Sequence, residues 1–415
     1  MDYLRRSIDS ELDERLPVVP ALAIDGPKGV GKTCTARRRA DVTWSLDDPS
    51  QREIARADFA LSSLSPGTAL LDEWQKLPQI RDSVRRHVDD GAPAGRFLLT
   101  GSAAPVDPSG THSGAGRILS LRMRPMGLHE RGVVDQTVSF SGLLKGQVAV
   151  QGNTEFALPD YAFEIVRSGF PGIMQAPDRL RAGLLSAYLQ RVIDRDLPDQ
   201  GYAVRRPETL RRWLAAYAAA SSSTASYSRI LDSTTGGDGT QPAKTTTIAY
   251  REHLTQLWLL DPVPGWIPAN NAIRRLQQAP KHQLADPALA ARLLDLSASA
   301  LLGPVGAHMA GPLFESLVTL GVRVLAQTEQ ATVSHLRVDS GAHEIDLIVQ
   351  GIDGQILAIE VKLAGQVDAA DVRHLHWLRD QMPDRIADLV VITTGTTAYR
   401  RPDGIAVVPL ALLGP

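Results

Sequence analysis

The residues of this sequence best suited to chemistry are eight that run from Gly26 to Thr33 in the pattern Gly-x-x-x-x-Gly-Lys-Thr. Such glycines let successive backbone N–H groups point at phosphate oxygens, and a following helix adds its positive end. The lysine reaches the β- and γ-phosphates, and the threonine hydroxyl ligates Mg²⁺. The pattern therefore predicts an ATP site whose residues are Gly26, Pro27, Lys28, Gly29, Val30, Gly31, Lys32, Thr33 and the adjoining Cys34.

The surroundings of this loop favour the same interpretation over a glycine-rich turn without a ligand. The apolar run 18–25 before it is typical of a buried parallel strand, and residues 34–40 after it are compatible with a helix. Lysine is also rare here, since the chain has 37 arginines and 7 lysines. Cys34, which is the sole cysteine, is expected to pack where this helix begins.

Acidic and hydroxyl side chains follow two further apolar runs. Asp72 and Glu73 end the run 68–71, where Asp72 is placed to hold Mg²⁺ and Glu73 to polarise the attacking water. Thr100 and Ser102 end the run 96–99, where a hydroxyl can sense the γ-phosphate. The alternative for the acids is a pair of surface carboxylates at a strand end.

One arginine, Arg117, is a candidate for neutralising charge on the γ-phosphate, either in its own subunit or in a neighbouring one. An ordinary surface arginine is the competing interpretation. Strands that alternate with helical spacing at 77–89 imply a parallel α/β sheet with its ligand at the carboxyl ends of the strands. The fold class expected for this part is therefore α/β.

The chain resembles a large bacterial and archaeal family of AAA-like ATPases, in the branch nearer to archaeal and signal-transduction ATPases than to protein unfoldases. The segments that carry the resemblance are 22–33 (LAIDGPKGVGKT), 46–48 (LDD), 70–90 (LLDEWQKLPQIRDSVRRHVDD), 96–105 (RFLLTGSAAP), 116–130 (GRILSLRMRPMGLHE), 168–172 (SGFPG) and 193–196 (IDRD). The resemblance implies ATP binding and hydrolysis. It also makes Arg195 a candidate phosphate-sensing arginine from the helical region.

The middle of the chain has the order helix, turn, helix and wing. A helix is expected at 207–220, approached by Arg205 and Arg206 and carrying Arg211 and Arg212, and a second begins near Lys244 after a Ser/Gly-rich loop at 221–243. This order resembles a winged-helix module. If it binds DNA, the residues facing phosphates and base edges would be Lys244, Thr245, Thr246 and Arg251. Many winged helices mediate only protein contacts, so that alternative stays open.

The C-terminal part has acids at particular places in a predicted order of helix, three strands, helix and strand. Glu360 and Lys362 point to one face of a strand because strand side chains alternate, Asp346 lies in the strand before it, and Glu315 lies in a helix. This arrangement resembles the restriction-endonuclease-like nuclease core with its D…E-x-K signature. The resemblance implies that Asp346, Glu360 and Glu315 hold Mg²⁺ and that Lys362 orients the attacking hydroxide. An amphipathic strand with solvated charges is the alternative.

Length and composition bound the remaining expectations. The chain has 415 residues and a net charge of −2, so a nucleic-acid site would have to come from local clustering. Neither a secretion signal nor a membrane span is expected, and the cytoplasm is the expected compartment. Four regions are expected: an ATPase core (1–130), a connector with a helical lid-like region (131–204), a winged-helix-like segment (205–285) and a nuclease-like domain (286–415).

Two hypotheses follow for the whole chain. The first is an ATPase that acts on nucleic acid, with DNA as the expected partner, ATP and Mg²⁺ as cofactors, and a Mg²⁺-dependent nuclease site at its C-terminus. The second is an ATP-gated regulator or scaffold whose C-terminal domain only docks DNA or a protein. The sequence leaves a homo-oligomer open in either case.

Overall fold

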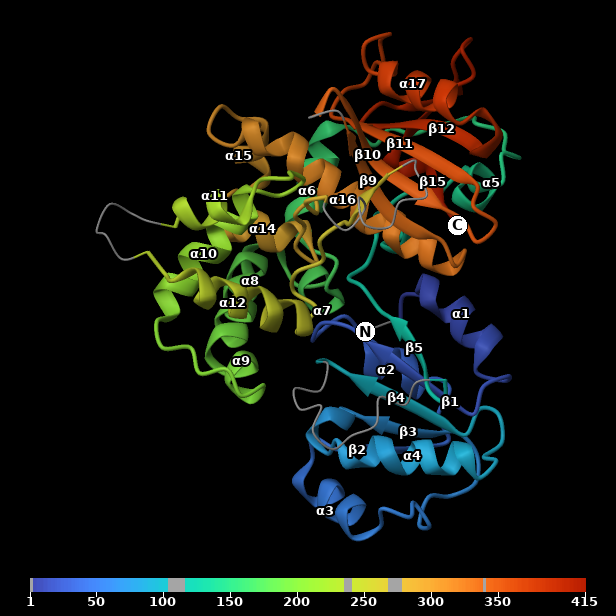
Figure 1. Cartoon of the computed structure of the whole chain (residues 1–415), viewed down its shortest axis with the longest axis vertical. Helices are drawn as coiled ribbons and strands as arrows, with labels where there is room; N and C mark the ends of the chain where they lie inside the picture. The colour runs from blue at the N-terminus through green and yellow to red at the C-terminus, as the bar shows by residue number, and fades with distance from the viewer. Residues whose placement is uncertain (1–2, 104–115, 235–240, 268–277, 339–340) are drawn as a thin grey trace.

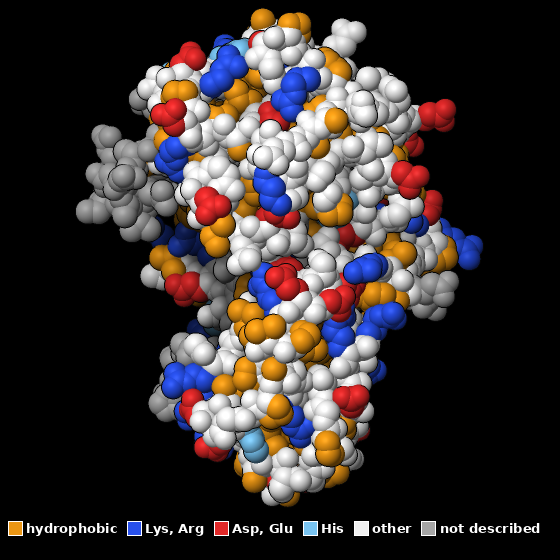
Figure 2. Space-filling model, turned by 90° about the vertical axis from the view of Figure 1, so that its right-hand side faces the viewer, with side chains coloured by type: hydrophobic (Ala, Val, Ile, Leu, Met, Phe, Trp, Pro, Cys, Tyr) orange, Lys and Arg blue, Asp and Glu red, His pale blue; other side chains and the backbone are white. Residues whose placement is uncertain are grey.

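The computed structural model describes residues 3–103, 116–234, 241–267, 278–338 and 341–415. An N-terminal lobe, a helical region and a C-terminal sheet region lie around a common centre (Figure 1). Seen from the side, the N-terminal lobe is the narrower end of the molecule, and acidic and basic side chains are interspersed over that face (Figure 2).

The N-terminal lobe is built on a five-stranded, fully parallel sheet in the order β2-β3-β4-β1-β5. Its central strands are apolar and buried because helices cover both faces of such sheets. The strands are β1 (Ala21–Asp25), β2 (Val42–Ser45), β3 (Ala69–Asp72), β4 (Phe97–Gly101) and β5 (Leu119–Arg122). The helices are α1 (Ser7–Arg15), α2 (Lys32–Arg37), α3 (Pro49–Ala57), the 3₁₀ turn η1 (Trp74–Lys76) and α4 (Gln79–Asp89). The expected parallel α/β sheet is therefore confirmed.

The helical region connects this lobe to the C-terminal part. Its helices are α6 (Leu158–Arg167), α7 (Pro171–Met174), α8 (Asp178–Arg191), the π-helical η3 (Val192–Asp196), α9 (Leu197–Asp199), α10 (Pro207–Ala219), α11 (Tyr227–Asp232), α12 (Lys244–Gln256), α14 (Pro287–Leu293) and α15 (Ala298–Leu302). Two short helices precede it in the chain, η2 (Leu128–Glu130) and α5 (Phe140–Leu144), and α5 lies beside the C-terminal sheet (Figure 1). Residues 178–196 are helical throughout, as α8 and η3. The segment expected to be loop at 221–243 contains α11, and its residues 235–240 lie outside the described residues.

The C-terminal sheet has eight strands in the order β7-β13-β14-β12-β11-β10-β9-β8. The strands are β7 (Gly152–Asn153), β8 (Gly265–Trp266), β9 (Thr332–Val338), β10 (His343–Gln350), β11 (Ile356–Lys362), β12 (Ile386–Thr393), β13 (Thr397–Arg400) and β14 (Ala406–Pro409). A separate parallel pair joins β6 (Val138–Ser139) to β15 (Leu413–Gly414). The remaining elements are α16 (Ala307–Thr328), α17 (Arg373–Gln381), η5 (Pro383–Arg385) and η6 (Leu410–Leu412).

The sequence interpretation assigned the C-terminal domain to residues 286–415, but its sheet also contains strands from outside that range. Its edge strand β7 comes from the connector, and its opposite edge strand β8 comes from the segment 205–285. Short strands added at both edges pair backbone groups that a free edge would leave open. Their contribution was not predictable because each has only two residues, too few for any periodicity.

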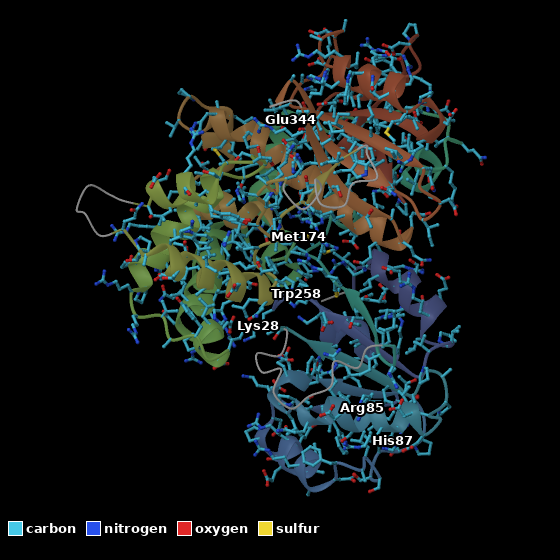
Figure 3. The ribbon with its side chains drawn as sticks, viewed as in Figure 1. Lys28, Arg85, His87, Met174, Trp258 and Glu344 are labelled. Carbon is cyan, nitrogen blue, oxygen red and sulfur yellow. The ribbon has the colours of Figure 1, made fainter. Side chains whose placement is uncertain are left out.

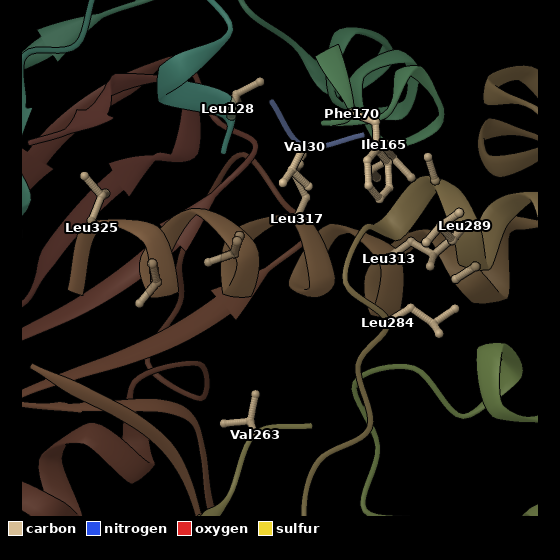
Figure 4. Close-up of a cluster of buried hydrophobic side chains, with 14 of the residues drawn as sticks. Val30, Leu128, Ile165, Phe170, Val263, Leu284, Leu289, Leu313, Leu317 and Leu325 are labelled. Carbon is tan, nitrogen blue, oxygen red and sulfur yellow. The ribbon is translucent and has the colours of Figure 1, made fainter. Parts of the chain in front are cut away.

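The long helix α16 is the common core element of the molecule. Its apolar residues belong to one buried cluster that reaches the N-terminal lobe, and Leu317 points toward Val30 of the phosphate loop (Figure 4). By length and composition alone, α16 could cross a membrane. However, 78% of its most apolar 18-residue stretch is buried inside the structure, as expected for a core helix.

Three regions of the chain meet at Asp261. Its carboxylate pairs with Arg122 (2.8 Å), the last residue of β5, and with Arg124 (2.9 Å), two residues later. It also pairs with Arg323 of α16 (2.8 Å). Burial opposes ionisation of Asp261, but the three guanidinium groups outweigh it and hold the pKa of the carboxyl well below its usual range. This junction ties the N-terminal sheet to the C-terminal helix.

Candidate functional site: the phosphate loop and the C-terminal acid cluster

The loop Gly26–Thr33 joins β1 to α2 in the middle of the parallel sheet. An added Cβ at Gly26 would lie 2.1 Å from the carbonyl oxygen of Met123, so only glycine fits there. Gly31 has φ 103, a left-handed conformation that glycine adopts without strain. Both glycines therefore shape the loop that leads into the N-terminus of α2.

Lys32 is buried, and its Nζ donates hydrogen bonds of 2.8 Å to the carbonyl oxygens of Gly26 and Pro27. Burial lowers the pKa of Lys32 to about 8, while Glu73, Asp25 and Asp72 oppose the shift. The ammonium form attracts phosphates, and in the free chain it is lost as the pH rises through about 8. Near neutral pH the loop therefore has a fixed positive charge at its centre.

The magnesium ligands predicted from the sequence lie together at the carboxyl edge of the sheet. Thr33 Oγ1 donates a 2.8 Å hydrogen bond to Asp72 Oδ1, and the Thr100 hydroxyl donates to the same oxygen. The ends of β3 and β4 are neighbours because Asp72 pairs with Thr100 in the sheet register. A hydroxyl and a carboxylate in contact fit Mg²⁺, which prefers oxygen ligands, so Thr33 and Asp72 would hold it.

Glu73 follows β3 in a left-handed conformation with φ 55. Its Oε2 accepts hydrogen bonds from Gln75 Nε2 (2.5 Å) and from the Ser102 hydroxyl (3.0 Å), and Gln75 Nε2 also contacts Ser102 Oγ (2.9 Å). The carboxylate is thus held in one orientation beside Asp72, as a residue that positions water would need. Sequence reasoning missed Gln75, which has no motif of its own.

The structure does not bring Arg117 to the phosphate loop. The prediction that Arg117 acts on the γ-phosphate within its own subunit is therefore wrong. Leu119 pairs with Leu22 near the beginning of β1, which places Arg117 at the amino edge of the sheet, opposite the loop. Arg117 Nε donates a hydrogen bond of 2.9 Å to Asp89, the last residue of α4. A role in a neighbouring subunit would require that edge to face a second copy.

The helical region contacts the phosphate loop directly. Lys28 Nζ donates a hydrogen bond of 2.5 Å to Oδ1 of Asp196, a buried residue of η3. Lys28 lies where the helical region meets the N-terminal lobe (Figure 3). Lys76 Nζ pairs with Asp199 at 2.9 Å close by. Arg195, the predicted sensor, is exposed on the same turn. The acid beside it, which the sequence interpretation did not single out, is the residue that contacts the loop.

A mostly apolar cavity of about 330 Å³ adjoins the loop on the side of α2. Its walls include Tyr3, Val30, Cys34, Met123 and Pro171. Arg38 lies over the Tyr3 ring, with 4.5 Å from its Cζ to the ring centroid. Cys34 is exposed, so the expectation that it packs is wrong: the first turn of α2 points it toward this cavity. Apolar and aromatic walls beside a phosphate site suit a flat heterocyclic base.

The three residues of the D…E-x-K signature and the helix acid Glu315 line one cavity of about 350 Å³ in the C-terminal sheet region. Glu315 comes from α16, Asp346 from β10, and Glu360 and Lys362 from β11. Lys362 Nζ lies 3.4 Å from Glu360 Oε2, and the backbone N–H of Val361 donates a hydrogen bond of 2.9 Å to Asp346 Oδ2. The structure therefore brings together the residues that the sequence interpretation grouped in one site.

These residues do not fit a divalent metal as they stand, because the ammonium of Lys281 lies among them. Its Nζ is 2.7 Å from Glu315 and 3.0 Å from Asp346. Across the described ranges of the chain, no three His, Cys, Asp or Glu side chains converge closely enough to hold a metal ion. Sequence reasoning missed Lys281, whose only signal was the rarity of lysine.

Burial and mutual repulsion govern the charges in this cluster. Burial, followed by the neighbouring Asp346, raises the pKa of Glu315 to about 8, and Lys281 opposes the shift. Burial and Asp346 likewise raise the pKa of Glu360 well above its ordinary value. Burial opposes ionisation of Asp346, but Lys281, the Val361 N–H and Lys362 together outweigh it and lower the pKa of this carboxyl. Near neutral pH the cluster therefore has Asp346 and Lys281 as its central ion pair.

Of the residues predicted to face DNA, three lie in the first turn of α12 and Arg251 lies about two turns further along. Lys244 and Thr245 are exposed, Thr246 is half-buried, and the Arg251 guanidinium lies 3.9 Å from the centroid of the Tyr227 ring. After α12, the chain pairs with itself through bridges at Leu260–Leu284 and Val263–Lys281. The winged-helix module and its binding to DNA both stay predictions.

Three family models match the chain. An AAA domain matches residues 19–131, a domain of unknown function (DUF8612) matches residues 158–300, and a second one (DUF4143) matches residues 310–413. The first match supports an AAA-like ATPase family and ATPase activity. The N-terminal parallel-sheet core has the corresponding fold.

The relatives found cover nearly the whole chain. Uncharacterized proteins of Mycobacterium bovis and Mycobacterium tuberculosis are each 26% identical to it, over 98% of this chain and 83% of theirs. Among solved structures, a Walker-type ATPase of Pyrococcus abyssi is 17% identical and has a TM-score of 0.41, with coverage of 70% of this chain and 96% of that one.

Proposed function

We propose that this chain binds Mg²⁺-ATP at Gly26–Thr33 and hydrolyses it as a nucleotide-dependent switch. The observation that carries the proposal is the meeting of Lys32, Thr33, Asp72 and Glu73 at one edge of the parallel sheet, with Asp72 bonded to Thr33 and Glu73 fixed beside it. Lys32 and the N–H groups of the loop bind the phosphates, and Glu73 accepts a proton from the attacking water. When bound, Mg²⁺ offsets the negative charge that develops on the phosphates.

The cavity beside the loop is proposed to hold the adenine base. Its walls belong to the loop itself (Val30), to the first turn of α2 (Cys34) and to the segment before α1 (Tyr3), so a base there would adjoin phosphates on the loop. Its mostly apolar lining suits the faces of a heterocycle.

This placement predicts that ATP protects Cys34 from alkylation. The thiol is exposed and is the chain's one cysteine, so N-ethylmaleimide incorporation measured by mass spectrometry reports on it alone. Saturating Mg²⁺-ATP is expected to slow labelling by about tenfold or more, since a bound ligand excludes reagent from a lined cavity. Lys32→Ala, with its phosphate contacts removed, serves as the control and should label at one rate with or without ATP. Equal rates for wild type in both conditions would place the base elsewhere.

The switch is proposed to act through the elements that contact the loop. Lys28 pairs with Asp196 of the helical region, and phosphates bound at the loop would compete with that carboxylate for the lysine. Val30 packs in the same buried cluster as Leu317 of α16, which also carries Glu315 of the acid cluster. Nucleotide binding can therefore bias the position of both regions, which is the minimum a switch requires.

Nucleic acid is the proposed partner of the middle segment. The support is the exposed start of α12, with Lys244 and Thr245, and the presence of Arg251 further along the same helix. The test is fluorescence anisotropy of a labelled DNA duplex at several salt concentrations, because affinity that falls steeply with salt marks phosphate contacts. Lys244→Ala should weaken binding without changing ATP hydrolysis in the absence of DNA. Salt-independent binding, or none, would favour the protein-docking alternative.

A Mg²⁺-dependent nuclease is the second candidate, supported by the meeting of Glu315, Asp346, Glu360 and Lys362 in one cavity. Lys281 weighs against it, because a metal would have to displace a buried ammonium group. Labelled DNA and RNA incubated with Mg²⁺ or Mn²⁺ test the point. Cleavage that disappears in Asp346→Ala would establish the nuclease, and the absence of cleavage leaves a docking role for the domain.

A further inference from the structure

The C-terminal acid cluster contains its own cation. Lys281 has only 1% of its side chain exposed, and its Nζ lies 2.7 Å from Glu315, 3.0 Å from Asp346 and 3.9 Å from Glu344. The two closest carboxylates come from different elements, α16 and β10. The ammonium is thus the group on which the acids converge.

The backbone around Lys281 fixes this placement. Lys281 and Val263 exchange two backbone hydrogen bonds of 2.9 Å, and the N–H of the next residue, His282, donates 2.9 Å to the carbonyl of Ser223. The imidazole Nε2 of His282 also contacts the carbonyl of Ala225 at 2.7 Å. Because Lys281 and His282 are held by these bonds, the Lys281 side chain enters the cluster from a fixed segment of backbone.

The ammonium of Lys281 competes directly with a divalent cation for this cluster. Mg²⁺ and Mn²⁺ bind carboxylate oxygens, and one oxygen each of Glu315 and Asp346 is already bonded to Nζ. A divalent ion beside a buried ammonium would also be repelled in a region of low dielectric constant. Lys362 does not offset this, because it is a further positive charge 3.4 Å from Glu360.

We propose that Lys281 replaces the divalent metal of the C-terminal acid cluster, so that the wild-type site binds no metal and removal of Lys281 opens one. The cavity would then be held together by an internal ion pair. In this chain the signature residues keep the shape of the fold while the metal chemistry is blocked.

The test is Mn²⁺ binding to the full chain without nucleotide, measured by electron paramagnetic resonance. Wild type is expected to show no Mn²⁺ binding that depends on Asp346. Lys281→Ala is expected to gain one Mn²⁺ per chain, at least tenfold tighter than any wild-type binding, and Lys281→Ala combined with Asp346→Asn should lose it. Lys145→Ala, which removes an exposed lysine 3.7 Å from Glu329, should behave as wild type.

Two results would overturn the proposal. One is Asp346-dependent Mn²⁺ binding by wild type with the affinity of Lys281→Ala, and the other is a folded Lys281→Ala that gains no ion. Lys281→Met keeps the length of the side chain and replaces the alanine variant if that one does not fold. If neither folds, the wild-type titration beside Asp346→Asn decides alone, because any difference between them contradicts the proposal. Without nucleotide present, none of these results depends on ATP hydrolysis.

Discussion

Glu73→Gln is expected to lower kcat for ATP hydrolysis by about 10²–10⁴-fold, the usual contribution of a general base. The amide keeps the size of the side chain and an oxygen that can accept from Gln75 and Ser102, so the site should hold its shape. What is lost is the negative charge that takes the proton from water. ATP affinity should change little, because the phosphates are bound by Lys32 and the loop.

A coupled-enzyme assay gives kcat, and titration with a fluorescent ATP analogue gives affinity. Glu53→Gln is the matched control, since that exposed acid pairs with Arg56 at 3.5 Å on α3, away from the phosphate loop. It should retain wild-type kcat. A kcat within threefold of wild type for Glu73→Gln would remove Glu73 from the reaction and leave its bonds with Gln75 and Ser102 as purely structural.

Asp261→Ala is expected to destabilise the chain by about 3–5 kcal/mol, the range for breaking a buried ion pair. The substitution leaves Arg122, Arg124 and Arg323 without the carboxylate that they share at 2.8 to 2.9 Å. Arg323 retains a bond to the carbonyl of Pro262 at 3.3 Å, and burial lowers its pKa and that of Arg122 to about 10. Because this site joins three regions, the loss should appear as a lower midpoint of thermal unfolding.

The pH dependence of stability provides a second test of the same substitution. The folded-state pKa of Asp261 is depressed, so its contribution to stability is complete above the unfolded value near 3.9 and is lost as the pH falls below it. The difference in unfolding midpoint between wild type and Asp261→Ala should therefore be full at pH 7 and shrink below about pH 4. Glu208→Ala, which breaks an exposed pair with Arg211 at 3.5 Å, should cost at most about 1 kcal/mol. Equal midpoints for wild type and Asp261→Ala at pH 7 would contradict a stabilising junction.

The elements nearest the phosphate site were predictable because their signals are local. The glycines and Lys32 of the loop, and Asp72 and Glu73 at the next strand end, each follow an apolar run, and parallel strands bring their carboxyl ends to one edge. The same rule explains the error at Arg117. It precedes β5, and residues that precede a parallel strand lie at the opposite edge from those that follow one.

The residues that were missed act across long separations in sequence. Lys281 contacts Asp346 65 positions away, Asp196 contacts Lys28 168 positions away, and Arg122 contacts Asp261 139 positions away. Lys281 and Asp261 lie outside every motif, and Asp196 and Arg122 lie in segments where no motif assigns them a role, so each is recognisable only by the charge that it meets in the folded chain. Gln75 is close in sequence to Glu73, but a glutamine on an irregular turn carries no pattern that predicts its role.

ATP hydrolysis by the full chain beside Lys32→Ala and Lys145→Ala tests the central claim most directly. Wild type and Lys145→Ala are expected to release phosphate from Mg²⁺-ATP at the same rate. Lys32→Ala should lose at least about 10²-fold, as removal of one charged donor from a phosphate site does. A wild type that releases no phosphate, or a Lys32→Ala variant as active as wild type, would contradict an ATPase built on Gly26–Thr33.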